Sequence, residues 1–158
     1  MNTATMFSTG KDDWQTPPEL FGQLNREFRF TLDLAANETN HKCNRWIGPG
    51  SPIAEDLLNY EIADGEVCWM NPPYSKGQQV EFIHTAANHA AGKRVTVVAL
   101  LPARTDTRAF HWYIWNAEEN KPRVWVREVR FLPGRLKFVG AAHGAPFPSM
   151  IVIFRGRA

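Results

Sequence analysis

The chain has 158 residues, of which 44% are hydrophobic and 22% are charged. This composition excludes a disordered or low-complexity protein, and the length indicates one domain with a substantial core. No apolar run is long enough to cross a membrane and no secretory leader is present, so we expect a cytoplasmic protein without a membrane partner. Cys43 and Cys68 are isolated and have no histidine at ligand spacing, which predicts free thiols and no metal site.

The charged residues are unevenly distributed. The net charge is only +2, but from Lys121 to the end eight Lys and Arg residues face a single acid, Glu128. Residues 1–120 carry ten bases and fifteen acids. The asymmetry indicates either a basic face that meets a polyanion or a set of solvated strand faces.

The first predicted elements are a helix and a short strand. Residues 1–13 are polar, and we expect a flexible N-terminus there. Apolar residues at helical spacing predict a helix over 17–28, with Thr16 as its N-cap. The segment 30–34 reads as a strand that contains Asp33 near its end.

The later elements are predicted from apolar runs and from proline. A strand over 66–70 is stopped by the prolines that follow it. The continuous apolar run over 95–101 is typical of a central parallel strand. Two further helices are expected over 79–91 and 109–116, and three further strands over 124–131, 136–139 and 150–154. Strands that alternate with helices and then cluster late predict an α/β fold whose last strands include a hairpin.

The tetrapeptide Asn71-Pro72-Pro73-Tyr74 follows the strand over 66–70. The amino group of adenine is a weak nucleophile because its lone pair is delocalised into the ring. An Asn side-chain oxygen and a backbone carbonyl aimed at the two amino hydrogens would localise that lone pair. The prolines keep the loop extended, and the tyrosine offers a face to an unstacked base. The tetrapeptide therefore predicts the catalytic loop of an enzyme that methylates an amino nitrogen; the alternative is a proline-rich turn.

Two acids are candidates for binding a ligand. Asp33 ends a predicted strand, where open α/β sheets bind ligands, and the small Ala35 after it would let a ligand approach the backbone. Asp56, at the predicted tip of a neighbouring strand, could accept a hydrogen bond from an adenine amino group. Each carboxylate is ambiguous alone, since Asp33 could also cap a helix.

Basic residues that could contact phosphates lie in two places. Arg104 and Arg108 follow the central strand, at the sheet edge expected for Asn71; the alternative is a loop that caps the helix beginning near Thr107. The basic C-terminal stretch contributes three more candidates, Arg130, Arg135 and Lys137. We expect Arg135 to lie in a late hairpin that could press on a phosphate backbone.

The order of the motifs resembles that of the phage-type Dam DNA N6-adenine methyltransferases. The segments that carry the resemblance are 14–18, 32–36, 56–57, 69–75, 100–107, 130–138 and 148–154. The similarity covers nearly the whole chain beyond residue 12. It implies a minimal single methyltransferase domain over 14–158, with a Rossmann-like fold: a mixed, mostly parallel sheet with helices on both faces.

The resemblance also implies S-adenosylmethionine as cofactor. Thr16 and Pro17 would lie near its methionine end, Asp33 and Ala35 would belong to the cofactor-binding motif, and Asp56 would contact its adenine. Two departures from the usual pattern are alanines at 35–36, where many methyltransferases carry glycines, and the lack of a clear acid for the cofactor ribose, for which Glu38 is the candidate.

The implied partner is double-stranded DNA in a bacterial or phage-infected cell, with one adenine flipped out of the helix and GATC as the suggested site. The oligomeric state stays open between a monomer and a weak dimer. One alternative is methylation of a glutamine side-chain amide, whose planar nitrogen the tetrapeptide would serve equally well. The other is a non-catalytic DNA-binding module that keeps the fold.

Overall fold

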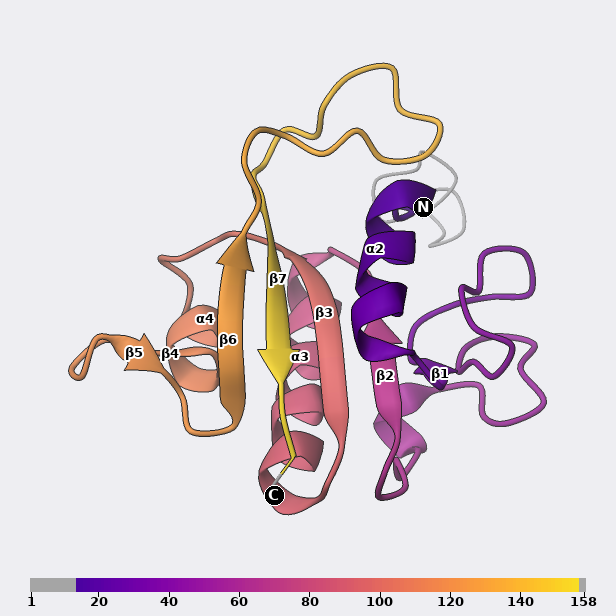
Figure 1. Cartoon of the computed structure of the whole chain (residues 1–158), viewed down its shortest axis with the longest axis horizontal. Coiled ribbons are helices and arrows are strands. Elements are labelled where there is room, and N and C mark those ends of the chain that lie inside the picture. Colours follow the sequence, from indigo (N-terminus) through magenta and orange to yellow (C-terminus); the bar gives the residue numbers. More distant parts are fainter. Residues whose placement is uncertain (1–13, 157–158) are drawn as a thin grey trace.

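The computed structural model describes residues 14–156 (Figure 1). Residues 1–13, for which the sequence predicts a flexible N-terminus, lie outside the described part. The helices are α2 (Pro18–Phe28), α3 (Lys76–Gly92), α4 (Arg108–Tyr113) and the short 3-10 helix η1 (Leu57–Asn59). The strands are β1 (Leu32–Asp33), β2 (Val67–Met70), β3 (Thr96–Pro102), β4 (Trp115–Asn116), β5 (Lys121–Pro122), β6 (Val126–Phe131) and β7 (Ser149–Phe154).

The central sheet has five strands in the order β1-β2-β3-β7-β6. β1, β2 and β3 are parallel, whereas β7 pairs antiparallel with both β3 and β6. β7 alone therefore runs against its neighbours, and the expected mixed, mostly parallel α/β sheet is confirmed. β4 and β5 form a separate antiparallel ribbon beside α4 (Figure 1).

A rudimentary strand extends the sheet beyond β1. Asp33 forms a parallel bridge with Trp46, its N–H donates to the Arg45 carbonyl at 3.0 Å, and the Ile47 N–H donates back to the Asp33 carbonyl at 2.8 Å. From β1 the chain thus goes first to this edge and then returns to form β2 on the other side of β1. Such a reversal of strand order opens a crevice outside the carboxyl ends of the strands, where ligands bind in open α/β sheets.

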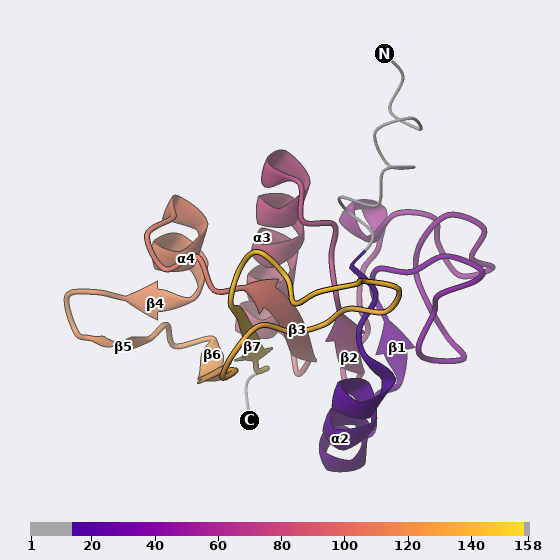
Figure 2. The same cartoon turned by 90° about the horizontal axis from the view of Figure 1, so that it is seen from above.

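Helices cover both faces of the sheet, as expected (Figure 2). Side chains alternate between the faces along each strand. In β3, Val97, Ala99 and Leu101 face the core formed with α3 and α4, while Val98 and Leu100 face the core formed with α2. All are essentially inaccessible to solvent, which explains why the strand reads as a continuous apolar run.

Three local predictions were wrong. Thr16 does not cap α2: Pro17 occupies the N-cap position, and no side chain donates or accepts there. The helix predicted over 109–116 ends at Tyr113 because the next residues enter the β4–β5 ribbon. The segment 136–139 is not a strand, although β6 and β7 do pair as an antiparallel hairpin.

A long connection, the 132–148 loop, replaces the predicted strand over 136–139. It leaves the end of β6 and arches over the sheet toward the start of α2 before it enters β7 (Figures 1 and 2). Phe138, Ala145 and Phe147 are buried and anchor it to the core on the α2 side. A backbone hydrogen bond of 3.0 Å from Val139 N–H to the Gln15 carbonyl ties it to the segment that precedes α2.

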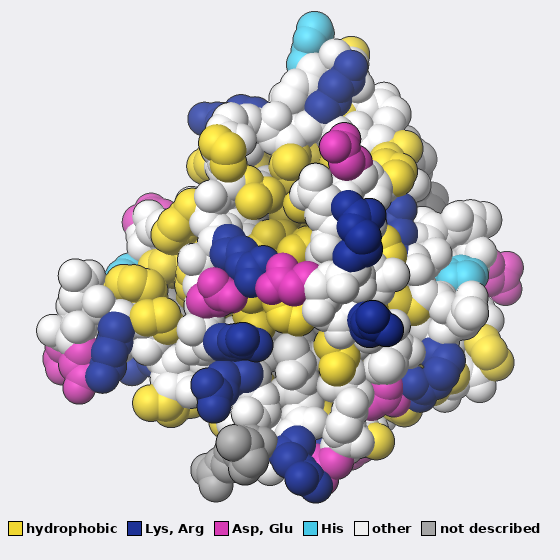
Figure 3. Space-filling view, in the orientation of Figure 1, with side chains coloured by type: hydrophobic (Ala, Val, Ile, Leu, Met, Phe, Trp, Pro, Cys, Tyr) yellow, Lys and Arg dark blue, Asp and Glu magenta, His cyan; other side chains and the backbone are white. Residues whose placement is uncertain are grey.

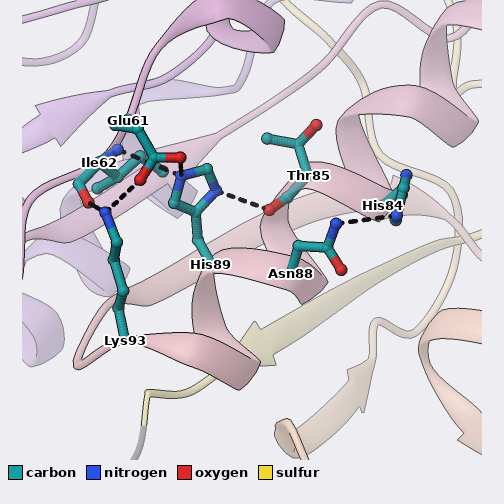
Figure 4. A network of polar contacts seen from close by, with 7 residues as sticks. All are labelled: Glu61, Ile62, His84, Thr85, Asn88, His89 and Lys93. Carbon is teal, nitrogen blue, oxygen red and sulfur yellow. Dashed lines mark hydrogen bonds and ion pairs between the residues drawn. The ribbon is translucent and has the colours of Figure 1, made fainter.

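A polar network holds the segment that follows η1 against α3 (Figure 4). The Nδ1 atom of His89 lies 2.9 Å from the Thr85 carbonyl, to which it donates, so Nε2 is free to accept from the Ile62 N–H at 3.3 Å. Lys93 pairs with Glu61 and donates to the Ile62 carbonyl at 2.9 Å. These contacts hold the segment after η1 against the last turns of α3.

Cys43 and Cys68 are free, as predicted. Within residues 14–156, no helix combines the length and the apolar character that crossing a bilayer requires.

Candidate active site

A cavity of about 730 Å³ opens at the carboxyl ends of β1 and β2, where the order of the strands reverses. It has the size of a typical small-molecule site. Its walls come from the segment before α2, the end of β1, the rudimentary strand, the start of η1, the end of β2 and the first turns of α3. Of the predicted site residues it brings together Thr16, Asp33, Ala35, Asp56, Asn71 and Pro73. Pro17, Pro72 and Tyr74 do not line it.

Asn71 follows β2 and lines the cavity. Its side-chain nitrogen Nδ2 donates to the Trp14 carbonyl at 2.5 Å and to the Thr16 hydroxyl at 3.0 Å. Its oxygen Oδ1 is buried and has no hydrogen-bond partner among the described residues. Because buried polar atoms are nearly always paired, an orphaned acceptor at this position indicates a donor supplied by a ligand.

Tyr74 does not offer a free ring face, contrary to expectation. The side chain is only 5% exposed and its hydroxyl donates to the Leu100 carbonyl at 3.1 Å. The ring stacks on Trp14 with a centroid distance of 6.4 Å and meets the edges of Phe138 and Phe147 at 6.3 and 5.5 Å. The 132–148 loop therefore helps to enclose the ring that was expected to stack on a base.

Asp33 closes the loop that follows β1 and caps no helix. Its carboxylate accepts from the Lys42 N–H at 2.9 Å and from the Ala35 N–H at 3.2 Å, and the residue is 2% exposed. Burial raises the pKa of this carboxyl to about 6, although the two N–H donors favour the charged form. The carboxylate thus combines a structural role with a place in the cavity wall.

Asp56 lies at the N-cap of η1 and not at the tip of a strand. Its two carboxylate oxygens accept from the Leu58 N–H at 3.0 Å and from the Asn59 side chain at 3.3 Å. Glu38, the candidate for the cofactor ribose, does not line the cavity.

The sequence interpretation missed several residues of the cavity wall. Gln78, Glu81 and Phe82 line it from the first turns of α3. Their spacing of three and four residues, soon after the Asn71–Tyr74 tetrapeptide, is the signal that could have found them, since such residues share one helix face. Lys42 is the one Lys or Arg among the described lining residues, and no local pattern marks it.

Four of the five predicted phosphate contacts are exposed and lie at the edge where Asn71 lies, three of them on loops and Arg108 at the start of α4. Arg104 and Arg108 follow β3, and Arg135 and Lys137 lie in the 132–148 loop. β6 runs parallel to β3, so the loop that leaves it begins at this same edge. Thr107 also caps α4, since its hydroxyl accepts from the Phe110 N–H at 3.2 Å. The residues after β3 therefore cap α4, as the alternative interpretation predicted, and Arg104 and Arg108 remain exposed.

Arg130 differs from the other four. Its guanidinium group is paired with the carboxylates of Glu27 and Glu128, each at 2.7 Å, and lies over the Phe28 ring. At the centre of the face seen in Figure 3, acidic side chains lie beside basic ones. We therefore do not place Arg130 on a DNA-binding surface.

Comparison with known proteins shows which family this chain belongs to. The family model described as DNA N-6-adenine-methyltransferase (Dam) matches residues 3–157. A protein of Haemophilus phage HP1 (strain HP1c1), named DNA N-6-adenine-methyltransferase, is 30% identical over 167 aligned positions, which cover 100% of this chain and 87% of the phage protein. The match favours adenine in DNA over the glutamine amide as the acceptor. The chain therefore belongs to the Dam family of DNA N-6-adenine-methyltransferases, enzymes that methylate adenine in DNA.

Proposed function

We propose that this chain transfers a methyl group from S-adenosylmethionine to the N6 amino group of an adenine flipped out of double-stranded DNA. The observation that carries the proposal is the buried, unpartnered Oδ1 of Asn71 beside a cavity at the switch point of the sheet. The family match supplies the reaction, and the phage origin of the relative supports a site of action in an infected bacterial cell. GATC is the target sequence that we propose to test first.

The residues of the cavity fit the proposed cofactor. S-adenosylmethionine supplies an electrophilic methyl group on a positively charged sulfur. Acidic side chains outnumber the single Lys in the described cavity wall: Asp33, Glu55, Asp56 and Glu81 against Lys42. Four carboxylates around an apolar floor complement a cationic, partly aromatic ligand. We propose that Asp56 lies at the adenine end, and that the sheet with its crevice is a Rossmann-like methyltransferase sheet.

Asn71 would act on the nitrogen that receives the methyl group. Its Oδ1 and the Pro72 carbonyl would accept the two amino hydrogens of the base, which draws the nitrogen out of planarity and localises its lone pair. The methylated nitrogen is briefly cationic and strongly acidic, so it can lose a proton to water or to the loop without a dedicated base. The cavity walls would hold the methyl donor and the acceptor base next to each other, and this proximity would further increase the rate.

The base has to reach an atom that is closed off in this structure. Trp14 lies against the ring of Tyr74, and the 132–148 loop packs on both. We propose that DNA binding at Arg135 and Lys137 draws this loop away, after which the base takes the place of the Trp14 side chain on the Tyr74 ring while the Trp14 carbonyl stays on Asn71. The buried aromatic contacts then mark the resting enzyme.

The direct test is incubation of the protein with methyl-labelled S-adenosylmethionine and DNA that lacks adenine methylation. We expect label in the DNA, recovered as N6-methyldeoxyadenosine after digestion to nucleosides. Sequencing of the methylated positions gives the recognised site. Asn71→Ala should reduce kcat by a factor of about 10² to 10³, as for loss of one preorganised contact to the transition state.

A matched control is Asn88→Ala, an exposed asparagine of α3 that contacts His84 and lies outside the cavity wall. This variant should keep wild-type activity. Label that appears only in protein would instead indicate glutamine methylation. Retention of DNA without any transfer by the wild type would indicate a binding module and overturn the proposal.

A further inference from the structure

The side-chain amide of Asn71 can present either its oxygen or its nitrogen to an acceptor base, and the proposed reaction needs the oxygen. The two ends of an Asn amide have almost the same shape, so only their hydrogen-bond partners select the orientation. Here both hydrogens of Nδ2 are taken, one by the Trp14 carbonyl at 2.5 Å and one by the Thr16 hydroxyl at 3.0 Å. This arrangement leaves Oδ1 as the atom available to the base.

We propose that Thr16 is a positioning residue for Asn71 and acts on methyl transfer through that side chain, rather than by holding the cofactor. The inference rests on the proposed function, because it assigns a task to Thr16 within the same reaction. The Trp14 carbonyl excludes the reversed amide, which would bring two acceptor oxygens within 2.5 Å of each other. The Thr16 hydroxyl completes the set by pairing the second amide hydrogen.

The two partners of Asn71 are themselves held in place. Thr16 is 1% exposed and directly precedes Pro17, the N-cap residue of α2. The Trp14 carbonyl lies only two residues before Thr16, so the segment that leads into α2 carries both partners, whichever position the Trp14 ring takes. A rigid support of this kind is what a catalytic group requires, since small errors in its orientation cost rate.

Replacement of Thr16 with Val keeps the shape of the side chain and removes the acceptor. One amide hydrogen of Asn71 is then buried without a partner. The amide rotates to find one, and Oδ1 is no longer aimed at the base. The cost of an unpaired buried group corresponds to a loss in kcat of about tenfold to a hundredfold. Thr16→Ser restores the hydroxyl and should keep kcat within about threefold of the wild type, as expected for a small change in packing.

The experiment measures three quantities for the wild type, Thr16→Val and Thr16→Ser: kcat, the Kd for S-adenosylmethionine by calorimetry, and the thermal midpoint. We expect Thr16→Val to lose kcat while Kd stays within about twofold, which is roughly the effect of a 0.4 kcal/mol change. A weakened Kd with unchanged kcat at saturation would show a cofactor contact and overturn the proposal. Equal loss in both variants would also overturn it, because the hydroxyl would then not be the cause.

A second measurement tests the proposal even if the Thr16→Val variant fails to fold. It uses the wild type and does not depend on enzyme activity. In ¹⁵N NMR spectra of the wild type, the two side-chain amide protons of Asn71, assigned by their loss in Asn71→Ala, should both exchange slowly with solvent. Fast exchange of either proton would overturn the proposal for Thr16. An inactive wild type that still shows two protected protons would instead refute the proposed function and leave the amide assignment supported.

Discussion

The guanidinium group of Arg130 in β6 donates two hydrogen bonds of 2.7 Å to the carboxylate of Glu27 in α2, across a separation of 103 residues. Glu128, two positions earlier on β6, accepts a third bond from the same group. The two hydrogen bonds to Glu27 run side by side, the paired geometry that Arg and carboxylate favour. The contact joins the helix to a strand at the far edge of the sheet, and the side chain of Arg130 is 32% exposed.

We expect Arg130→Ala to lower the free energy of unfolding by about 1 kcal/mol. The ion pairs are partly exposed and each is worth little, but their loss also removes the hydrogen-bonded cation that lies between Glu27 and Glu128. Arg127→Ala, which removes an exposed arginine of the same strand, is the matched control and should change stability by less than about 0.5 kcal/mol. Urea denaturation measures both. An equal effect of the two variants would show that the pairing contributes nothing.

The exposed basic residues of the 132–148 loop should account for part of the salt dependence of DNA binding. Each phosphate contact that is lost lowers the slope of log Kd against log salt concentration by about one. We therefore expect Arg135→Ala and Lys137→Ala each to reduce that slope by about one, and Arg130→Ala to leave it unchanged. Fluorescence anisotropy with a labelled duplex gives the slopes. A fall for Arg130→Ala would place this residue on the DNA after all.

Asp33 should make the free energy of unfolding depend on pH, with a contribution that is more favourable in acid than at neutral pH. Its pKa is raised to about 6 in the folded state, against an ordinary value of 3.8. The folded protein therefore holds this proton more tightly than the unfolded chain does. The resulting penalty is absent below about pH 4 and complete above about pH 6, where it amounts to about 3 kcal/mol at 1.36 kcal/mol per pKa unit.

Comparison with Asp33→Asn isolates this effect. The variant loses one acceptor for a backbone N–H, which is an offset that does not depend on pH. From pH 4 to pH 7 the unfolding free energy of the wild type should fall relative to that of the variant. Urea denaturation at several pH values without cofactor measures the difference, and parallel curves would contradict the raised pKa.

Gly48, at the rim of the cavity, should not tolerate a side chain. Its φ of +149° lies in the range that glycine favours, and a Cβ atom there would lie 1.7 Å from the Ala36 carbonyl oxygen. Gly48→Ala should cost several kcal/mol, since backbone on both sides has to move. A Cβ atom at Gly77 in α3 would meet nothing within 4 Å, so Gly77→Ala should instead stabilise by up to about 1 kcal/mol. Thermal denaturation distinguishes the two; equal midpoints would contradict the close contact.

The sequence by itself was sufficient to predict the parallel core and the place of the Asn71–Tyr74 tetrapeptide directly after β2. The strand over 95–101 could be predicted because both of its faces are buried, which requires an unbroken apolar run. The position of Asn71 could be predicted because prolines end a strand wherever they follow it. Both features depend on residues that are neighbours in the sequence, so they can be predicted without knowledge of the rest of the fold.

The tertiary structure alone decided which polar groups are occupied and which are free. Arg130 and Arg135 look alike in the basic stretch, but a carboxylate more than a hundred residues away neutralises one of them. Tyr74 looks available for a base, but Trp14 and the 132–148 loop enclose it. Thr16 looks like a helix cap, yet it accepts a hydrogen bond from Asn71. Each outcome depends on a contact between distant segments, and such contacts leave no periodic trace in the residues around either partner.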